Sequence, residues 1–297
     1  MFFARLLSSS QYYGYCFYGH CLRNIWFTSF RQIIVFKIPY WSVLLMVVGF
    51  FIGTTMLLYW FLPRITKPTK DGDQIRTVSI LVGVVGAFYG MLFGLVNVNL
   101  WQNYHKIQDI ISQEANSLAG VVLNSAVFPP TAQNNIDNAV KNYIHELRNN
   151  EWREMALQKS SPQAWEYMHN IFKALQAYQP ANSYEQVYYS ATLSKLNDAV
   201  AARRARIDAL QNYIPEPLFH ILVIGSLLLM ILLNLTIVKV GRTKFLLFMS
   251  IVVNTLIALN LYLVLDLDNS FLGRVTIHST LFSEGILMQL DKTSSTP

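Results

Sequence analysis

Residues 78–100 read VSILVGVVGAFYGMLFGLVNVNL, a run without a single Asp, Glu, Lys or Arg. A helix needs about 20 apolar residues to cross the hydrocarbon core of a bilayer, because each residue adds about 1.5 Å along its axis. A helix also satisfies its own backbone hydrogen bonds in lipid, where water cannot do so. This run therefore predicts a membrane-spanning helix.

Three further runs have the same character and lie on both sides of this one, at residues 41–62, 217–238 and 245–265. Across the 297 residues, 53% are hydrophobic and 13% are charged, and this charged share is about half that of a typical soluble domain. The sequence predicts an all-α membrane protein with four transmembrane helices in two hairpins, residues 41–100 and 217–265.

Short polar joins connect the two members of each pair. Residues 63–73 contain two prolines and an Asp-Gly step, and residues 239–244 read KVGRTK. Such residues end helices, so both joins are expected on one side of the membrane. The basic and aromatic tail 1–40, the central segment 101–216 and the C-terminal tail 266–297 would face the other side. Lys and Arg are abundant on both sides, and the positive-inside rule leaves the orientation open.

The central segment 101–216 is predicted to be a helical insert outside the membrane. Ile107, Ile111 and Leu118 recur at helical spacing just beyond residue 100, so the second span is expected to continue into water as one long helix. Pro129-Pro130 would end that helix. Further helices are expected at residues 131–150, 162–177 and 184–213.

Two charged residues interrupt the apolar seams of this insert. Glu114 lies on the helix that leaves the second span, and Arg203 lies on the helix that enters the third span. Each stands fourteen residues from its span boundary, about 21 Å along a straight helix. The hypothesis is a bidentate ion pair between them that fixes the register of two antiparallel helices. The alternative is two solvated charges on exposed faces.

Small residues and amides mark the second span. Glycines let two backbones approach closely in lipid, and amides are tolerated there when they are hydrogen-bonded. Two interpretations stay open: packing within one chain, chiefly of the first span on the second, or a face that lines a pore or a subunit interface. The residues concerned are Gly83, Gly86, Gly90, Gly94, Asn97 and Asn99.

Catalytic and metal-binding signatures are not found in the sequence. It has no phosphate-binding glycine loop, no G-x-S-x-G and no H-E-x-x-H, and Cys16 and Cys21 lack the spacing of a metal site. The net charge is +6, and the Lys and Arg residues lie in membrane-flanking segments and helices rather than on one element that could read nucleic acid, so membrane lipids are the expected counter-charge. We expect no enzymatic activity, no cofactor, no metal and no nucleic acid partner.

Several motifs resemble the bacterial bestrophin-like domain family. They are LWQNY at 100–104, EANSL at 114–118, AARRAR at 201–206 and LDLD at 265–268, where Asp266 and Asp268 form a membrane-exit turn. The similarity extends over about residues 41–285. After Asp268 the chain departs from the family pattern, because Asn269-Ser270-Phe271 replaces a basic residue and a proline.

This resemblance implies a multi-pass protein of the bacterial plasma (inner) membrane that self-associates and conducts ions. Bestrophins are pentameric anion channels whose second spans line the pore, so the glycines and amides of residues 83–99 would lie near the axis. We recognise neither the aromatic neck motif nor the acidic calcium-binding run of bestrophins, and calcium gating is not implied. A homo-oligomeric ion channel with inorganic ions as partners is the leading hypothesis. A non-conducting sensor or scaffold that binds a partner through the insert is the alternative.

Overall fold

The computed structural model of the protein describes residues 40–66, 72–157, 159–211, 214–241, 243–268, 271 and 277–292. Tail residues 1–39 with Cys16 and Cys21, parts of both joins, and residues 293–297 lie outside the described residues. The chain divides into two compact units, Met1–Val43 and Leu44–Pro297. Only the start of one helix is described in the first unit, so the packing below is that of the second.

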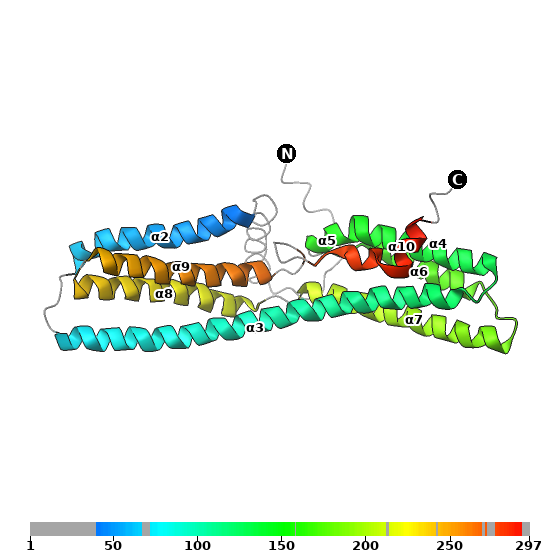
Figure 1. The fold of residues 1–297 in the computed structure, drawn as a ribbon, viewed down its shortest axis with the longest axis horizontal. Helices are drawn as coiled ribbons and strands as arrows, with labels where there is room; N and C mark the ends of the chain where they lie inside the picture. Colours follow the sequence, from blue (N-terminus) through cyan, green and yellow to red (C-terminus); the bar gives the residue numbers. More distant parts are fainter. Residues whose placement is uncertain are drawn as a thin grey trace, which may run out of the picture. The chain divides into compact units, whose positions relative to one another are not determined.

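Four helices are long and apolar enough to cross a membrane. They are α2 (Tyr40–Ile65), α3 (Gly72–Ser125), α8 (Glu216–Val240) and α9 (Lys244–Leu267) (Figure 1). Each contains one predicted span, so the prediction of four apolar helices is confirmed. Every regular element within the described ranges is a helix, as expected of an all-α protein.

Local signals set the helix boundaries near the joins. Pro63 lies in the last turn of α2. α8 ends at Gly241, whose φ of 121° is a conformation that side chains with a Cβ rarely adopt. The hydroxyl of Thr243 accepts the N–H of Leu246 at 3.2 Å and caps α9. Because Gly241 ends α8 and Thr243 already caps α9, only three residues separate the two helices.

Three of the four apolar helices pack against one another. α3 contacts both α8 and α9, and α8 contacts α9. α2 is joined to α9 through Asn254, whose Nδ2 donates to Thr55 Oγ1 at 2.9 Å. Among the described residues α2 and α3 share no extensive contact. The expected packing of the first span on the second is therefore not observed within one chain, and the two-hairpin arrangement stays a prediction.

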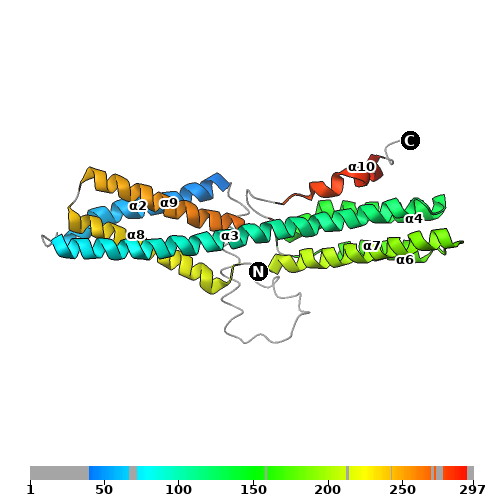
Figure 2. The same ribbon diagram turned by 60° about the horizontal axis from the view of Figure 1, so that its bottom comes forward.

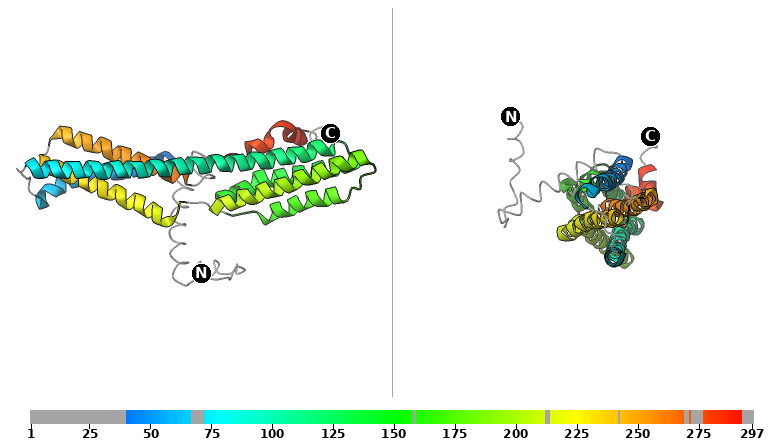
Figure 3. Two further views of the ribbon diagram at one scale, coloured as in Figure 1. Left: turned by 90° about the horizontal axis from the view of Figure 1, so that it is seen from below. Right: turned by 90° about the vertical axis from the view of Figure 1, so that its left-hand side faces the viewer.

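Helix α3 runs without interruption for 54 residues (Figure 3, left). It continues beyond the predicted span and ends at Ser125, before Pro129 and Pro130. The expectation of one long helix that leaves the second span is confirmed. Its outer half carries the apolar seam, because Ile107, Ile111 and Leu118 are all buried.

The described part of the central segment contains four further helices, one π-helical turn and one 3₁₀ turn. They are α4 (Pro130–Glu146), the π-helical turn η1 (Leu147–Glu151), α5 (Trp152–Ala156), α6 (Pro162–Gln176) and α7 (Ser183–Asp208), which continues as a short 3₁₀ turn, η2 (Ala209–Gln211). Ser161 caps α6 and Asn182 caps α7 through their side chains. The predicted helix 131–150 is thus interrupted by a π-turn, and the predicted helix 184–213 ends at residue 208.

The core of this segment is formed chiefly by α3 against α7 and by α4 against α6. Figure 2 shows α3 and α7 running along each other. α3 and α7 make the most extensive helix–helix contact in the described chain. Leu118 of α3 and Leu196 of α7 are fully buried, as are Ile136 of α4 and Ile171 of α6. One apolar core therefore joins all four helices.

Part of the predicted C-terminal tail belongs to this core. Residues 277–292 form the short turn η3 (Ser279–Ser283) and the helix α10 (Gly285–Lys292), and α10 packs on α3 and α4. Phe282 is fully buried, and the indole N–H of Trp152 donates to the carbonyl of Ile277 at 3.2 Å. Residues 277–292 thus pack on the helices of the central segment rather than forming a free tail.

Candidate functional site

A groove of about 570 Å³ lies between α3, α8 and α9. Gly83, Gly86 and Gly90 line it from α3. A Cβ added at Gly83 or Gly90 would meet no atom within 4 Å, and one at Gly86 would meet only Leu229 at 3.9 Å. The position of Gly94 is equally open. The glycine face therefore makes no close helix contact within the described chain.

The close approach between spans occurs instead at Tyr89 and Gly225. A Cβ at Gly225 of α8 would lie 2.3 Å from the Tyr89 ring, so only glycine leaves room for this tyrosine. The Tyr89 hydroxyl donates to the carbonyl of Leu222 and lies 3.1 Å from Ser226 Oγ. Sequence analysis missed this contact. The sequence feature that indicates this contact is Tyr89 itself, a tyrosine within an apolar span, because a phenol in lipid needs a polar partner.

The two amides at the end of the second span have different surroundings. Asn97 Nδ2 lies 3.5 Å from Asn260 Oδ1 of α9, a contact between helices, and its own Oδ1 is buried without a partner in the described chain. Asn99 is exposed and donates to the carbonyl of Leu95 on its own helix at 3.0 Å. Asn97 therefore lies between α3 and α9, whereas Asn99 faces away from the other described helices.

Much of the surface of α3 is uncovered within the described chain, and one row of exposed side chains can be followed along most of the helix. Within the apolar half the members of this row recur at steps of three or four residues, and the largest, Phe88, is 72% exposed. Beyond residue 100 the same face continues with exposed polar side chains. The members are Ile80, Val84, Phe88, Met91, Leu95, Val98, Gln102, Asp109, Gln113 and Asn116. We call this face the α3 stripe.

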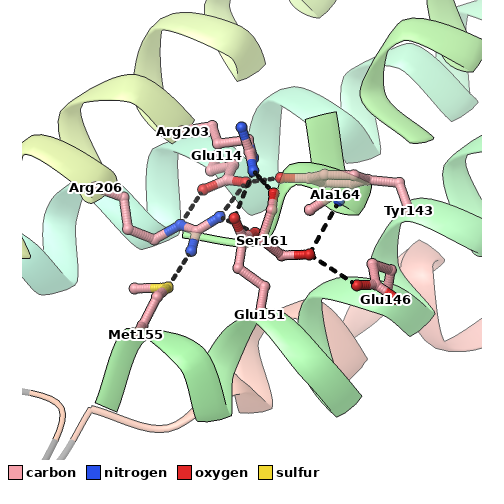
Figure 4. Close-up of polar contacts among 9 residues, drawn as sticks. All are labelled: Glu114, Tyr143, Glu146, Glu151, Met155, Ser161, Ala164, Arg203 and Arg206. Atoms are coloured by element: carbon pink, nitrogen blue, oxygen red, sulfur yellow. Dashed lines mark hydrogen bonds and ion pairs between the residues drawn. The ribbon is translucent and has the colours of Figure 1, made fainter. Parts of the chain in front are cut away.

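The insert contains a buried cluster of charged residues (Figure 4). Glu114 of α3 accepts two hydrogen bonds from Arg206 of α7, with Oε2 to Nε at 2.6 Å and Oε1 to Nη2 at 3.1 Å. Tyr143 of α4 donates its hydroxyl to Glu114 Oε1 at 2.5 Å. All three side chains are fully buried. This is a bidentate guanidinium–carboxylate pair, the geometry that best compensates the loss of water.

The predicted partner of Glu114 was Arg203, and this pairing is wrong. Arg203 donates instead to Glu151 Oε1 at 2.5 Å, while Glu114 is bound by Arg206, one helical turn further along α7. The prediction assumed an unbroken helix between residue 203 and the third span. α7 ends at Asp208 and continues as a 3₁₀ turn, which has a larger rise per residue. Arg203 therefore does not stand at the same height above the predicted span as Glu114.

Glu151 completes the cluster because of the π-turn that carries it. Its carboxylate bridges the two arginines, with Oε1 to Arg203 Nη2 at 2.5 Å and Oε2 to Arg206 Nη2 at 3.2 Å. A π-turn inserts an extra residue into a helix and shifts the side chains that follow it. The carboxylates of Glu114 and Glu151 thus face the two guanidinium groups directly, and a third buried carboxylate, Glu146, accepts the hydroxyl of Ser161 at 3.0 Å beside them.

Burial and neighbouring charges fix the protonation of this cluster. Burial raises the pKa of Tyr143 well above its ordinary value, and the Glu114 carboxylate raises it further. Burial lowers the pKa of Arg206, but Glu114, Tyr143 and Glu151 outweigh this effect, so the net shift is upward. Tyr143 therefore keeps its proton as a hydrogen-bond donor, and Arg206 keeps its charge.

Arg203 is less fully satisfied than Arg206. Its Nη2 also donates to the carbonyl of Ser161 at 3.4 Å, and its guanidinium carbon lies 4.2 Å from the centre of the Trp165 ring. Its Nε and Nη1 are buried and have no partner within the described chain. The stacked indole compensates part of the charge but supplies no hydrogen bond.

The membrane-exit turn has a structural role at Asp268. Oδ1 of Asp268 accepts the backbone N–H of Ile214 at 2.8 Å, and both residues are buried. This bond ties the end of α9 to the residue that precedes Pro215 and the start of α8. Asp266 lies one position before the end of α9. Within the described ranges, no group of three or more His, Cys, Asp or Glu side chains could hold a metal ion.

The chain is similar to one protein family and to several solved structures. The model of the bestrophin-like domain family matches residues 49–282. The crystal structure of a bestrophin homologue from Klebsiella pneumoniae superposes with a TM-score of 0.66 at 13% identity, over 85% of this chain and 99% of that protein. Two single-residue variants of it give TM-scores of 0.65 and 0.63, at 13% and 12% identity, over 85% and 88% of this chain and 99% and 100% of theirs. Among curated proteins, none matches.

Proposed function

Since this chain belongs to the bestrophin-like domain family, we propose that it assembles into a homo-oligomeric ion channel of the bacterial plasma membrane. Four apolar helices make it a multi-pass membrane protein. Its partners would be other copies of the chain, membrane lipids and inorganic ions. A catalytic role has no support from any cluster of titratable groups in the spans.

The α3 stripe is the observation that carries this proposal. Its side chains are apolar where the helix is apolar and polar where the helix leaves the predicted span. In the described chain its side chains are exposed, although Asp109, Gln113 and Asn116 border Lys195 and Asp198 of α7. A helix that lines an axis shared by several copies would present such a continuous face, and it would pass from a narrow apolar segment into a wetter vestibule.

The apolar half of the stripe would form the narrowest part of this pathway. Ile80, Val84 and Phe88 follow at four-residue steps and are 59%, 48% and 72% exposed. A ring of such side chains can gate ions by excluding water. Sequence analysis did not single out these residues.

The glycines and amides would support this pathway from the side of α3 that faces α8 and α9. Gly83, Gly86 and Gly90 line the groove there, and Asn97 bonds toward Asn260. Because the glycines make no close helix contact within the described chain, they would leave room for another copy of the chain or for lipid in this groove, while Asn97 would join α3 to α9. Asn99, which is exposed, would lie where the polar half of the pathway begins.

Recording from the purified protein in planar bilayers tests the proposal. We expect ion-selective unitary currents, and Phe88→Ala should increase their amplitude because it removes the largest exposed side chain of the stripe. Phe248→Ala is the matched control, since Phe248 is 60% exposed on α9, away from the stripe. A folded oligomer that never conducts would contradict the channel and favour a scaffold that binds a partner through the insert.

A further inference from the structure

Most of the net charge of the chain is concentrated at two short segments. Residues 64–76 and 239–244 together hold seven of the Lys and Arg residues but only two of the Asp and Glu residues. They therefore account for five of the six net positive charges. These segments join the apolar helices in pairs, so the charge is gathered where four apolar helices end.

The structure brings the described members of this set to one end of the helices. The C-terminal ends of α2 and α8 and the N-terminal ends of α3 and α9 lie at the same end of the second unit (Figures 1 and 3). Arg64, Arg76, Lys239 and Lys244 stand at these four helix ends. We call this set the basic end.

Three cations of the basic end face solvent. Arg64, Arg76 and Lys244 are exposed, and none of the three forms an ion pair with another residue of the described chain. The buried arginines of the insert, in contrast, are neutralised by carboxylates. Arg64, Arg76 and Lys244 lie where the apolar helices end, which is the level of the lipid headgroups if these helices cross a membrane. An anionic group at that level would balance their charge.

Arg64 is also held in a geometry suited to the membrane interface. Its guanidinium carbon lies 3.5 Å from the centre of the Trp60 ring, and its Nη1 donates to the Trp60 carbonyl at 3.0 Å. Trp60 itself is 62% exposed. An exposed tryptophan that carries an arginine is typical of the headgroup region, where the indole lies at the edge of the hydrocarbon and the cation faces the phosphates.

We infer that the basic end binds the phosphate headgroups of anionic phospholipids. The bound lipid would place its acyl chains along the exposed apolar faces of α2 and α9 and its phosphate among Arg64, Arg76, Lys239 and Lys244. This site rests on the insertion of the four helices in a membrane and is independent of ion conduction. It also gives the chain a lipid preference that apolar burial alone would not give.

Native mass spectrometry of the purified protein with phosphatidylglycerol or phosphatidylcholine tests this inference. Each Lys or Arg near a membrane surface strengthens binding of anionic lipid by roughly fivefold, so the triple variant R64Q/R76Q/K244Q should bind phosphatidylglycerol about a hundredfold more weakly. Phosphatidylcholine binding should not change. The matched control R153Q/K159Q/K173Q removes the same charge from exposed positions of the insert and should leave both affinities unchanged.

Two further measurements make the result unambiguous. The variant R64K/R76K/K244R keeps the charge and should retain the preference, which separates charge from folding. Inorganic phosphate at millimolar concentration should not displace the lipid, because it lacks the acyl chains. Equal binding of phosphatidylglycerol by the wild type and R64Q/R76Q/K244Q would overturn the inference, whether or not the protein conducts ions.

Discussion

At the scale of single residues, the most demanding feature is the buried pair of Glu114 and Arg206. Both side chains are fully buried in the insert, and a charge in that position is stable only with its partner. Glu114 and Arg203 both interrupt apolar seams of the sequence, and both are buried in the structure. Sequence analysis could not assign the partners, since Glu151 reaches the cluster only through a π-turn that no residue pattern announces.

A double-mutant cycle tests the corrected pairing. Glu114→Ala alone should destabilise the protein by about 3–5 kcal/mol, because it leaves two buried arginines, Arg203 and Arg206, to share the single carboxylate of Glu151. The coupling energy with Arg206→Ala should exceed that with Arg203→Ala, as measured by unfolding in detergent. Glu166→Ala, an exposed glutamate of α6, should change stability by less than about 0.5 kcal/mol. Stronger coupling of Glu114 to Arg203 would restore the original pairing.

The raised pKa of Tyr143 predicts a loss of stability in alkaline solution. Below pH 10 the tyrosine is protonated in both the folded and the unfolded states, and the full contribution is present. Above pH 10 the unfolded chain loses this proton while the folded chain retains it, so the free energy of unfolding falls. Tyr143→Phe should flatten this part of the pH profile, as measured by chemical unfolding in detergent at a series of alkaline pH values. An unchanged slope in Tyr143→Phe would show that other groups cause it.

At the scale of helices, the sequence was most informative where one physical rule acts alone. The apolar runs, the proline stops and the long extension of α3 follow from hydrophobicity and backbone geometry, and all were predicted. Contacts between spans were not, because many small residues look alike in the sequence. The glycines of α3 suggested close packing, yet the close contact uses Gly225 of α8, a glycine without a repeat around it.

Alanine at Gly225 should therefore disturb the membrane helices more than alanine at the repeated glycines. A Cβ there would lie 2.3 Å from the Tyr89 ring, and overpacking of this kind costs about 1–3 kcal/mol. Gly94→Ala adds the same methyl group in open space and should have little effect. The thermal unfolding midpoint in detergent distinguishes them. Equal midpoints for the two variants would contradict the proposed contact between α3 and α8.

At the scale of the whole molecule, α3 is the helix that links the apolar helices to the helices of the central segment. It packs against α8 and α9 among the apolar helices, against α7 in the central segment and against α10 in the C-terminal segment. The described chain nevertheless leaves the α3 stripe uncovered. The sequence alone could not predict which face of α3 stays open, because that depends on which helices pack against it.

The most direct test is the accessibility of the α3 stripe during conduction. In a background of Cys16→Ser and Cys21→Ser, Val84→Cys would place a thiol on the stripe, and Leu57→Cys would place one on the exposed face of α2. A charged, membrane-impermeant thiol reagent should block single-channel current through Val84→Cys and leave Leu57→Cys unaffected. Persistent current after complete modification of Val84→Cys would contradict the assignment of α3 to the ion pathway.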